Sequence, residues 1–209
     1  MRLSTFLISL LLLIASVIAV KHYRTPLSPL ELKADATILA FGDSLTYGYG
    51  ALPHESYPAR LEQKLHRTVI NAGIPGELSE QGLQRLPPLL HKYHPDILIL
   101  CHGGNDLLQK KSLTSLRYNL EQMIRLARAQ QIEVVLIAVP EFGLLHLEPL
   151  PVYEELAKAY RLPIESNILS GLLHDNRYKS DYIHPNAAGY EKMAEAVEKI
   201  VRKEYRVDE

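Results

Sequence analysis

Short apolar runs alternate with stretches of helical periodicity from about residue 35 to the end of the chain. The apolar runs have the length of buried strands; they span 37–41, 68–70, 96–100 and 134–139, with a shorter one at 162–164. The helical stretches repeat apolar residues every three to four positions; they cover 57–66, 81–93, 113–127 and 190–201, and one more ends at 156–160. Strands that alternate with helices predict a parallel sheet with helices on both of its faces.

Two prolines and the length of the periodic region refine this prediction. Pro87 and Pro88 lie inside the stretch 81–93 and predict a kink or a split there, because proline donates no N–H to a helix. Residues 35–205 contain no internal repeat and no low-complexity segment, and their number suits one hydrophobic core. We therefore expect a single α/β domain over 35–205.

The N-terminal segment has a different character. Residues 3–20 carry no charge and are mostly aliphatic, with Arg2 before them and Lys21 after them. A basic start and an apolar run are typical of a secretory signal, and the run is also just long enough to span a bilayer. We expect 1–24 to be a signal peptide cleaved after residue 19 or an uncleaved anchor in the inner membrane, and 25–34 to be a linker. Both alternatives predict export, to the periplasm or as a secreted protein, and the second adds membrane association through 3–20.

Composition excludes several classes of protein. Hydrophobic residues make up 47% of the chain and charged residues 22%, which is the balance of a globular protein. Cys101 is the one cysteine in the sequence, so the fold depends on its core rather than on disulfides. The net charge is −1, and beyond residue 25 the 20 basic residues face 24 acidic ones. This balance predicts no nucleic-acid partner.

Candidate chemistry lies in the segments that follow the strands, since ligands bind parallel α/β sheets outside the carboxyl ends of the strands. Ser44 follows the first run; a serine needs an imidazole to accept its proton, and the imidazole needs a partner that orients it. Asp181 and His184, three residues apart, could supply both groups. Ordinary structural roles are the alternatives: Ser44 as a turn or cap residue, Asp181 as a turn cap, and Asn186 as the N-cap of the last helix.

A second set of residues could stabilise the oxyanion that forms during acyl transfer. Gly76 offers a backbone N–H that a substrate can approach closely, and Asn105 offers a side-chain amide. Loop turns and a helix cap are the alternatives for these two residues. His102 is expected to support the site or to face solvent rather than to act in catalysis.

Four blocks of the sequence resemble those of the SGNH (GDSL) hydrolases, and they occur in the same order. The blocks are Gly42-Asp43-Ser44-Leu45, Asn71 to Gly76, Gly103-Gly104-Asn105-Asp106 and Asp181-x-x-His184. The stretches 81–87 and 184–186 are similar to the bacterial thioesterase I, arylesterase and lysophospholipase branch. The resemblance covers about 36–202, and Pro75 and Pro88 depart from it.

This resemblance implies a flavodoxin-like three-layer α/β/α sandwich with a five-stranded parallel sheet, and a serine esterase without cofactor or metal. It implies that Ser44 is the nucleophile, that His184 is the general base and then the acid, and that Asp181 orients His184. The oxyanion hole would consist of the backbone N–H groups of Ser44 and Gly76 and the amide of Asn105. The implied substrates are small-molecule acyl or aryl esters, lysophospholipids or acyl thioesters.

The segment 140–151 is expected to shape the substrate site. It is rich in apolar side chains, and it lies at the carboxyl end of the fourth predicted strand. Such a loop either folds back onto the core or forms an acyl-binding wall. The predicted substrate-binding residues are Phe142, Leu144, Leu145 and Leu147.

Three other functions stay open at this point. One is a carbohydrate O-acetyl esterase of the same fold. Another is a metal-dependent phosphoesterase, for which the ligand spacing is poor; its ligands would be Asp43, His102, Asp106 and His184. The last is a membrane-tethered binding module, although the chain lacks the glycine-rich loop with Lys-Ser/Thr that cradles nucleotide phosphates.

Overall fold

A five-stranded parallel sheet is the central element of the part of the chain that the structure describes. The structure is a computed structural model, and it describes residues 30–141 and 147–207. The strand order is β3-β2-β4-β5-β6, and every neighbouring pair is parallel. The strands are β2 (Thr37–Gly42), β3 (Thr68–Gly73), β4 (Ile97–Cys101), β5 (Glu133–Ile137) and β6 (Ile164–Glu165). The α/β class and the five-stranded parallel sheet predicted from the sequence are confirmed.

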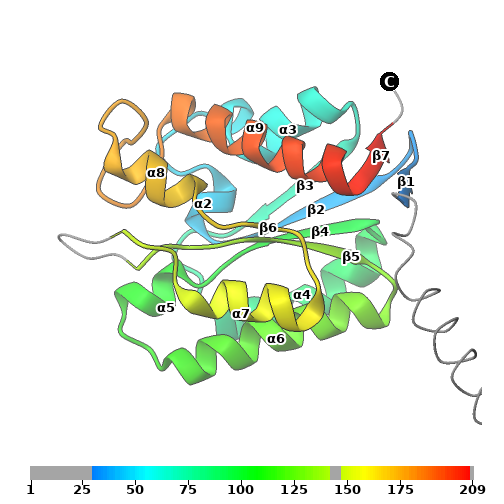
Figure 1. Cartoon of the computed structure of the whole chain (residues 1–209), viewed down its shortest axis with the longest axis horizontal. Helices are drawn as coiled ribbons and strands as arrows, with labels where there is room; N and C mark the ends of the chain where they lie inside the picture. The colour runs from blue at the N-terminus through cyan, green and yellow to red at the C-terminus, as the bar shows by residue number, and fades with distance from the viewer. Residues whose placement is uncertain (1–29, 142–146, 208–209) are drawn as a thin grey trace, which may run out of the picture. The chain divides into compact units, whose positions relative to one another are not determined.

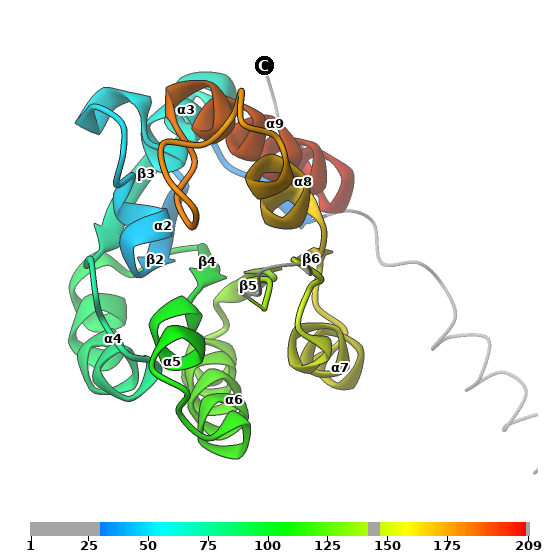
Figure 2. The same cartoon turned by 90° about the vertical axis from the view of Figure 1, so that its left-hand side faces the viewer.

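Helices cover both faces of this sheet (Figure 1). One face carries α3 (Tyr57–Leu65), α8 (Ile168–His174) and α9 (Ala187–Glu204), and the other carries α4 (Ser79–Tyr93), α6 (Leu113–Ala129) and α7 (Pro151–Tyr160). Seen from the carboxyl ends of the strands, the three layers separate clearly (Figure 2). The short helices α2 (Ser44–Tyr47) and α5 (Gly104–Leu108) follow β2 and β4 at the carboxyl ends of these strands. A 3₁₀ turn spans Pro53–Glu55.

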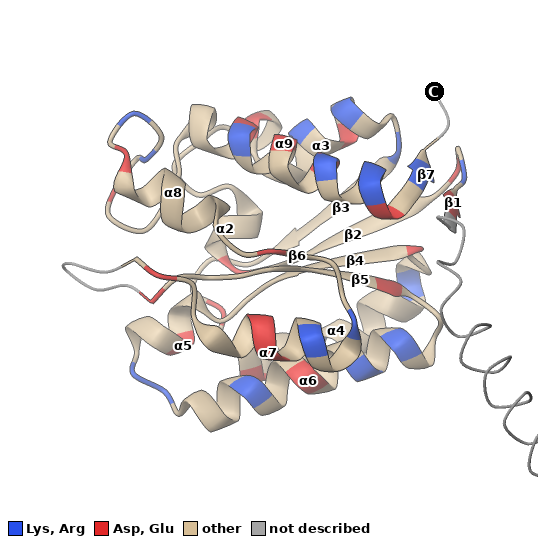
Figure 3. Cartoon of the chain, viewed as in Figure 1, with Lys and Arg blue, Asp and Glu red and all other residues tan. Residues whose placement is uncertain are grey.

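Burial explains why the strands occupy the middle layer. All five residues of β4 are buried, and in β2 the run from Ile38 to Phe41 is fully inaccessible to solvent. Strands that lie between two helical layers need apolar side chains on both faces. Most charged residues lie on the helices and connecting segments; β2, β3 and β4 carry none, and β5 and β6 carry one glutamate each (Figure 3).

Helix α4 excludes one of the two outcomes that its prolines predicted, a split of the helix. It runs from Ser79 to Tyr93 as one helix, with Pro87 and Pro88 inside it. Each proline removes one N–H donor, and the burial of Leu86 and Leu90 against the core outweighs that loss. The spacing in 113–127 places Leu113 on the apolar face of α6 with Leu116 and Leu120, but Leu113 at the start of the helix is exposed.

Residues 30–32 lie within the linker that was expected over 25–34, but they form a strand. This strand, β1 (Leu30–Leu32), pairs with β7 (Tyr205–Val207) in a separate two-stranded sheet. Leu32 and Tyr205 are both buried. The expected signal peptide or anchor over 1–24 lies outside the described residues. Within 30–141 and 147–207, no helix is both long enough and apolar enough to cross a bilayer.

Candidate active site

The register of the three central strands brings the candidate residues together. Gly42 at the end of β2 is level with Gly73 of β3 on one side and with Cys101 of β4 on the other. The segments that follow these strands therefore leave the sheet at one edge (Figure 2). They contain Ser44, Gly76 and Asn105 respectively.

Ser44 begins helix α2 directly after a very tight strand end. A Cβ atom on Gly42 would lie 1.9 Å from the carbonyl oxygen of Cys101, so only glycine fits there. Asp43 caps the helix, and its Oδ1 accepts a hydrogen bond from the backbone N–H of Leu45 at 3.1 Å. Because Ser44 is the first helical residue, its own N–H has no acceptor within the helix. That N–H remains available to a substrate oxygen.

A continuous series of hydrogen bonds joins Asp181, His184 and Ser44. Oδ2 of Asp181 lies 2.8 Å from Nδ1 of His184, and Nε2 of His184 lies 2.9 Å from Oγ of Ser44. The other carboxylate oxygen of Asp181 accepts the backbone N–H groups of Ile183 and His184, both at 2.9 Å. The same aspartate thus caps the turn and orients the imidazole, so the two interpretations of Asp181 are compatible.

The surroundings favour ionised Asp181 beside the imidazole. Partial burial opposes ionisation, but the hydrogen bonds from the His184 ring and from the Ile183 N–H outweigh it, and the pKa of Asp181 is lowered. The side chain of Asp181 is 43% exposed, whereas that of His184 is 11% exposed. The imidazole is therefore held from one side by a carboxylate and is largely screened from water.

Two neighbours fix the loop that carries His184. The Tyr49 ring packs against the imidazole at a centroid distance of 4.6 Å, and the Tyr49 carbonyl accepts a hydrogen bond from the Tyr190 hydroxyl of α9. Asn186 is the N-cap of α9, and its side chain accepts the N–H of Gly189 at 3.0 Å. The cap expected from the sequence at Asn186 is confirmed. Tyr49 had no sequence signal, since its role depends on a contact with a residue far along the chain.

The two other candidate donors, Gly76 and Asn105, lie at the same edge. Gly76 has φ +81°, and a Cβ there would meet no described atom within 4 Å, so its backbone is open to a ligand. The amide nitrogen of Asn105 donates to the carbonyl oxygen of Glu77 at 3.0 Å. An amide nitrogen carries two N–H groups, and this bond uses one of them.

The four residues proposed as metal ligands have other partners. Asp106 accepts both the backbone N–H and the hydroxyl of Ser79, at 2.8 and 2.6 Å. His102 is fully buried and faces Glu77, not solvent. Asp43 accepts the N–H of Leu45, and burial raises the pKa of its carboxyl group, which disfavours the ionised form that a metal ligand needs. In the described parts of the chain, no three His, Cys, Asp or Glu residues are grouped so that they could hold a metal ion.

A small hollow lies beside Ser44. Its volume is about 10 Å³, and apolar groups from α2, α5 and the His184 loop contribute Leu45, Leu108 and Ile183 to its lining. Of the predicted substrate-binding residues, Phe142, Leu144 and Leu145 lie outside the described residues. Leu147 is half-buried and does not line this hollow. Its contact with a substrate stays a prediction.

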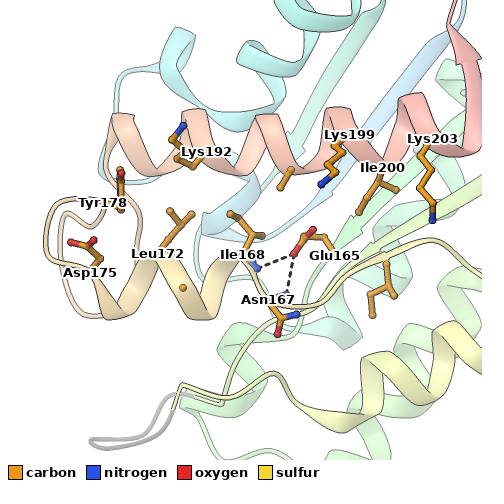
Figure 4. Close-up of a pocket in the computed structure, with 13 residues that line it drawn as sticks. Glu165, Asn167, Ile168, Leu172, Asp175, Tyr178, Lys192, Lys199, Ile200 and Lys203 are labelled. Carbon is orange, nitrogen blue, oxygen red and sulfur yellow. Dashed lines mark hydrogen bonds between the residues drawn. The ribbon is translucent and has the colours of Figure 1, made fainter.

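A separate groove of about 590 Å³ runs between α8 and α9 (Figure 4). Ile168, Leu172 and Ile200 provide apolar walls, and the lysines of α9 along it include Lys199. Glu165 also lines the groove, where its carboxylate accepts the N–H groups of Asn167 and Ile168. None of the predicted catalytic residues is among those that line it.

Comparison with known proteins gives a consistent result. Residues 40–192 match the model of the GDSL-like lipase/acylhydrolase family. The chain is 32% identical over 157 residues to thioesterase 1/protease 1/lysophospholipase L1 of Escherichia coli K12, covering 72% of this chain and 76% of that protein. It is 30% identical over 174 residues to esterase TesA of Pseudomonas aeruginosa, covering 78% of this chain and 87% of that one.

Solved structures agree with the sequence comparison. The crystal structure of TesA superposes with a TM-score of 0.73 at 29% identity, and the match covers 80% of this chain and 98% of the other. The resemblance to this family that the four sequence blocks indicated is confirmed. The chain belongs to the GDSL-like lipase/acylhydrolase family and is a carboxylic ester hydrolase.

Proposed function

We propose that the protein is a serine esterase that works through an acyl-enzyme on Ser44. The observation that carries the proposal is the unbroken series from Asp181 through His184 to Ser44, with steps of 2.8 and 2.9 Å. In neutral His184, an Nδ1–H that donates to Asp181 leaves Nε2 free to accept the serine proton. The hydroxyl oxygen of Ser44 then attacks the ester carbonyl carbon.

The developing oxyanion would accept hydrogen bonds from three donors. These are the N–H groups of Ser44 and Gly76 and the second amide N–H of Asn105, and each donor contributes about 3 kcal/mol in such sites. Collapse of the tetrahedral intermediate expels the alcohol or thiol, which takes the proton from His184. Water, deprotonated by the same imidazole, then releases the acid and regenerates Ser44.

Labelling by a fluorophosphonate probe tests this proposal. We expect the full chain to be labelled on Ser44, and Ser44→Ala to abolish both the labelling and the ester turnover. Ser170→Ala is the matched control, because Ser170 is a partly buried serine of α8 outside the site. Unlabelled protein, or equal labelling of Ser44→Ala, would refute the proposal. Turnover should also persist in the presence of a chelator, and its loss would favour the metal-dependent alternative.

For the substrate, we propose acyl esters of the kinds named in the relatives, which are called thioesterase, lysophospholipase and arylesterase. Measuring kcat/KM for a panel of acyl thioesters, lysophospholipids and aryl esters of matched chain length would rank these substrate classes.

We further propose that Leu144 and Leu145 bind the acyl chain. Alanine at both positions should then lower turnover of long-chain esters more than that of acetyl esters, and equal losses would refute this assignment.

We also propose that residues 3–20 direct export of the protein. The support is the uncharged apolar run with basic residues at both ends. Fractionation of cells that express the full chain with a C-terminal epitope tests it. Protein found only in the cytosol at full mass would refute export, and the mass of the exported form distinguishes cleavage from anchoring.

A further inference from the structure

Both oxyanion donors outside helix α2 depend on the position of one residue, Glu77. Gly76 precedes Glu77 directly, so the orientation of the Gly76 peptide follows the backbone of its neighbour. Asn105 donates its first amide N–H to the Glu77 carbonyl oxygen at 3.0 Å. A carbonyl oxygen only accepts, so the nitrogen of the Asn105 amide must face it, and this contact fixes the rotamer of the side chain.

The carboxylate of Glu77 accepts hydrogen bonds from two side chains, those of Arg85 and His102. Nε and Nη2 of Arg85 donate to Oε1 and Oε2 of Glu77 at 2.7 and 2.6 Å, in the two-pronged geometry that fixes a carboxylate best. Nε2 of His102 lies 3.1 Å from Oε2 and donates to it, since a carboxylate oxygen accepts. The Glu77 side chain is 6% exposed, and that of His102 is 0% exposed.

This cluster is tied to the elements around it. Nη2 of Arg85 also donates to the carbonyl of Ala72 in β3 at 3.0 Å, and its guanidinium lies 4.3 Å from the centroid of the Phe41 ring in β2. On the other side, the carbonyl of His102 accepts the hydroxyl of Tyr153 from α7 at 2.7 Å. The cluster therefore connects β2, β3, the end of β4 and α7.

The energetics favour a positional role over a stabilising one. Burial of a carboxylate and a guanidinium costs desolvation energy, which their attraction only roughly offsets, so a buried ion pair adds little net stability. Burial opposes ionisation of Glu77, but the hydrogen bonds from Arg85 and His102 outweigh it and lower the pKa of Glu77. Nδ1 of His102 is buried with no hydrogen-bond partner, so this residue carries an added cost.

We infer that Glu77, Arg85 and His102 form a positioning cluster that holds the Gly76 N–H and the Asn105 amide at the oxyanion hole. The inference rests on the proposed serine-esterase function and extends it to three residues that need not touch the substrate. Displacement of donors by about 1 Å costs up to about a hundredfold in rate. Because the oxyanion exists only in the transition state, kcat should fall while KM changes little.

Glu77→Gln is the first test, in the full chain with a soluble nitrophenyl ester. The amide cannot accept both prongs of Arg85, so we expect kcat to fall ten- to a hundredfold with KM within twofold. Affinity for a trifluoromethyl ketone, whose adduct places an oxyanion in the hole, should fall in proportion. Glu133→Gln is the matched control, since Glu133 pairs with Arg128 at the opposite end of β5, and it should change kcat less than twofold.

Two substitutions of His102 separate positioning from packing. His102→Gln keeps an N–H donor near the place of Nε2, whereas His102→Leu removes that donor and also removes the unpartnered buried Nδ1. We expect His102→Leu, assayed well below its melting temperature, to be folded yet about tenfold slower, and His102→Gln to recover most of kcat. A purely structural role predicts instead that activity follows the melting temperature.

The outcomes also separate this inference from the proposed function. If Asn105→Ala lowers kcat about a hundredfold while Glu77→Gln and His102→Leu stay within threefold of the wild type, the positioning cluster is refuted and the esterase mechanism stands. If Asn105→Ala has no effect, both are refuted. A double variant tests the connection directly: Glu77→Gln should cost less in the Asn105→Ala background than in the wild type, because the two changes act through one donor.

Discussion

Asp181→Asn tests the proposed mechanism most sharply, because the backbone dictates how the new amide must sit. Oδ1 of Asp181 accepts two backbone N–H groups, from Ile183 and His184. An asparagine keeps both bonds only if its oxygen takes that place, which turns its NH₂ group toward Nδ1 of His184. Nδ1 must then accept, so the ring proton moves to Nε2 and the imidazole can no longer take a proton from Ser44.

The size of the effect follows from these contacts. Flipping the amide to restore the productive tautomer breaks two backbone hydrogen bonds, at about 1 kcal/mol each. Loss of the carboxylate charge removes about 2 kcal/mol of attraction for the imidazolium, a low figure that reflects the 43% exposure of the Asp181 side chain. Together these give about 4 kcal/mol, so kcat should fall about 10³-fold.

The assay is steady-state hydrolysis of a soluble nitrophenyl ester by the purified full chain. Asp181→Ala removes the charge but leaves both tautomers accessible, so it should be about tenfold more active than Asp181→Asn. Asp175→Asn is the matched control: Asp175 accepts the N–H of Arg177 in a similar turn of the same segment, and the change should leave kcat within twofold. An asparagine variant as active as the alanine variant would refute the tautomer argument, and two variants within threefold of the wild type would refute the triad.

Further predictions concern stability. The pKa of Glu77 lies below its usual 4.5, so the ionised carboxylate stabilises the fold above that pH, and this contribution is lost as the pH falls through the lowered pKa. In urea unfolding below pH 4.5, the free energy of unfolding should therefore fall less for Glu77→Gln than for the wild type. Parallel plots of that free energy against pH would contradict this. Gly42→Ala should destabilise the chain by at least about 3 kcal/mol, whereas Gly171→Ala, whose Cβ meets nothing within 4 Å, should stabilise it by about 0.5 kcal/mol. Tyr153→Phe leaves the His102 carbonyl without its donor and should cost about 1–3 kcal/mol in the same assay; an unchanged midpoint would show that this bond is not stabilising.

The sequence predicts those parts of the molecule that depend on local periodicity. The apolar run 37–41 and the helical spacing in 190–201 correspond to β2 and most of α9. Helix α8 was missed, because Ile168–His174 is too short for a clear period. Pro87 and Pro88 predicted a kink or a split, and α4 is not split, since local propensity cannot register the burial of Leu86 and Leu90.

Some residues of the candidate site could likewise be predicted from the sequence, and others could not. Ser44, Asp181 and His184 follow from residue type and spacing, and the structure brings them together at hydrogen-bond distance. The only sequence signal for Glu77 is that it follows Gly76, and the only one for Arg85 is that it lies in the stretch 81–87, which resembles the thioesterase I branch. Their pairing with His102 depends on the sheet order, which puts β3 and β4 on either side of β2. Spacing along the chain does not reveal that order.

The docking of α9 has a consequence for how activity first arises in each new molecule. The imidazole comes from the loop just before this helix, 140 positions after the serine that it contacts, and Tyr190 of α9 bonds to Tyr49 beside the imidazole. In a chain still emerging from the ribosome, the strands β2, β3, β4 and β5 and the serine turn are all synthesised before that loop. Hydrolysis therefore begins only when the His184 loop and α9 have been made and packed, and recovery of ester turnover after dilution from denaturant should report the docking of α9.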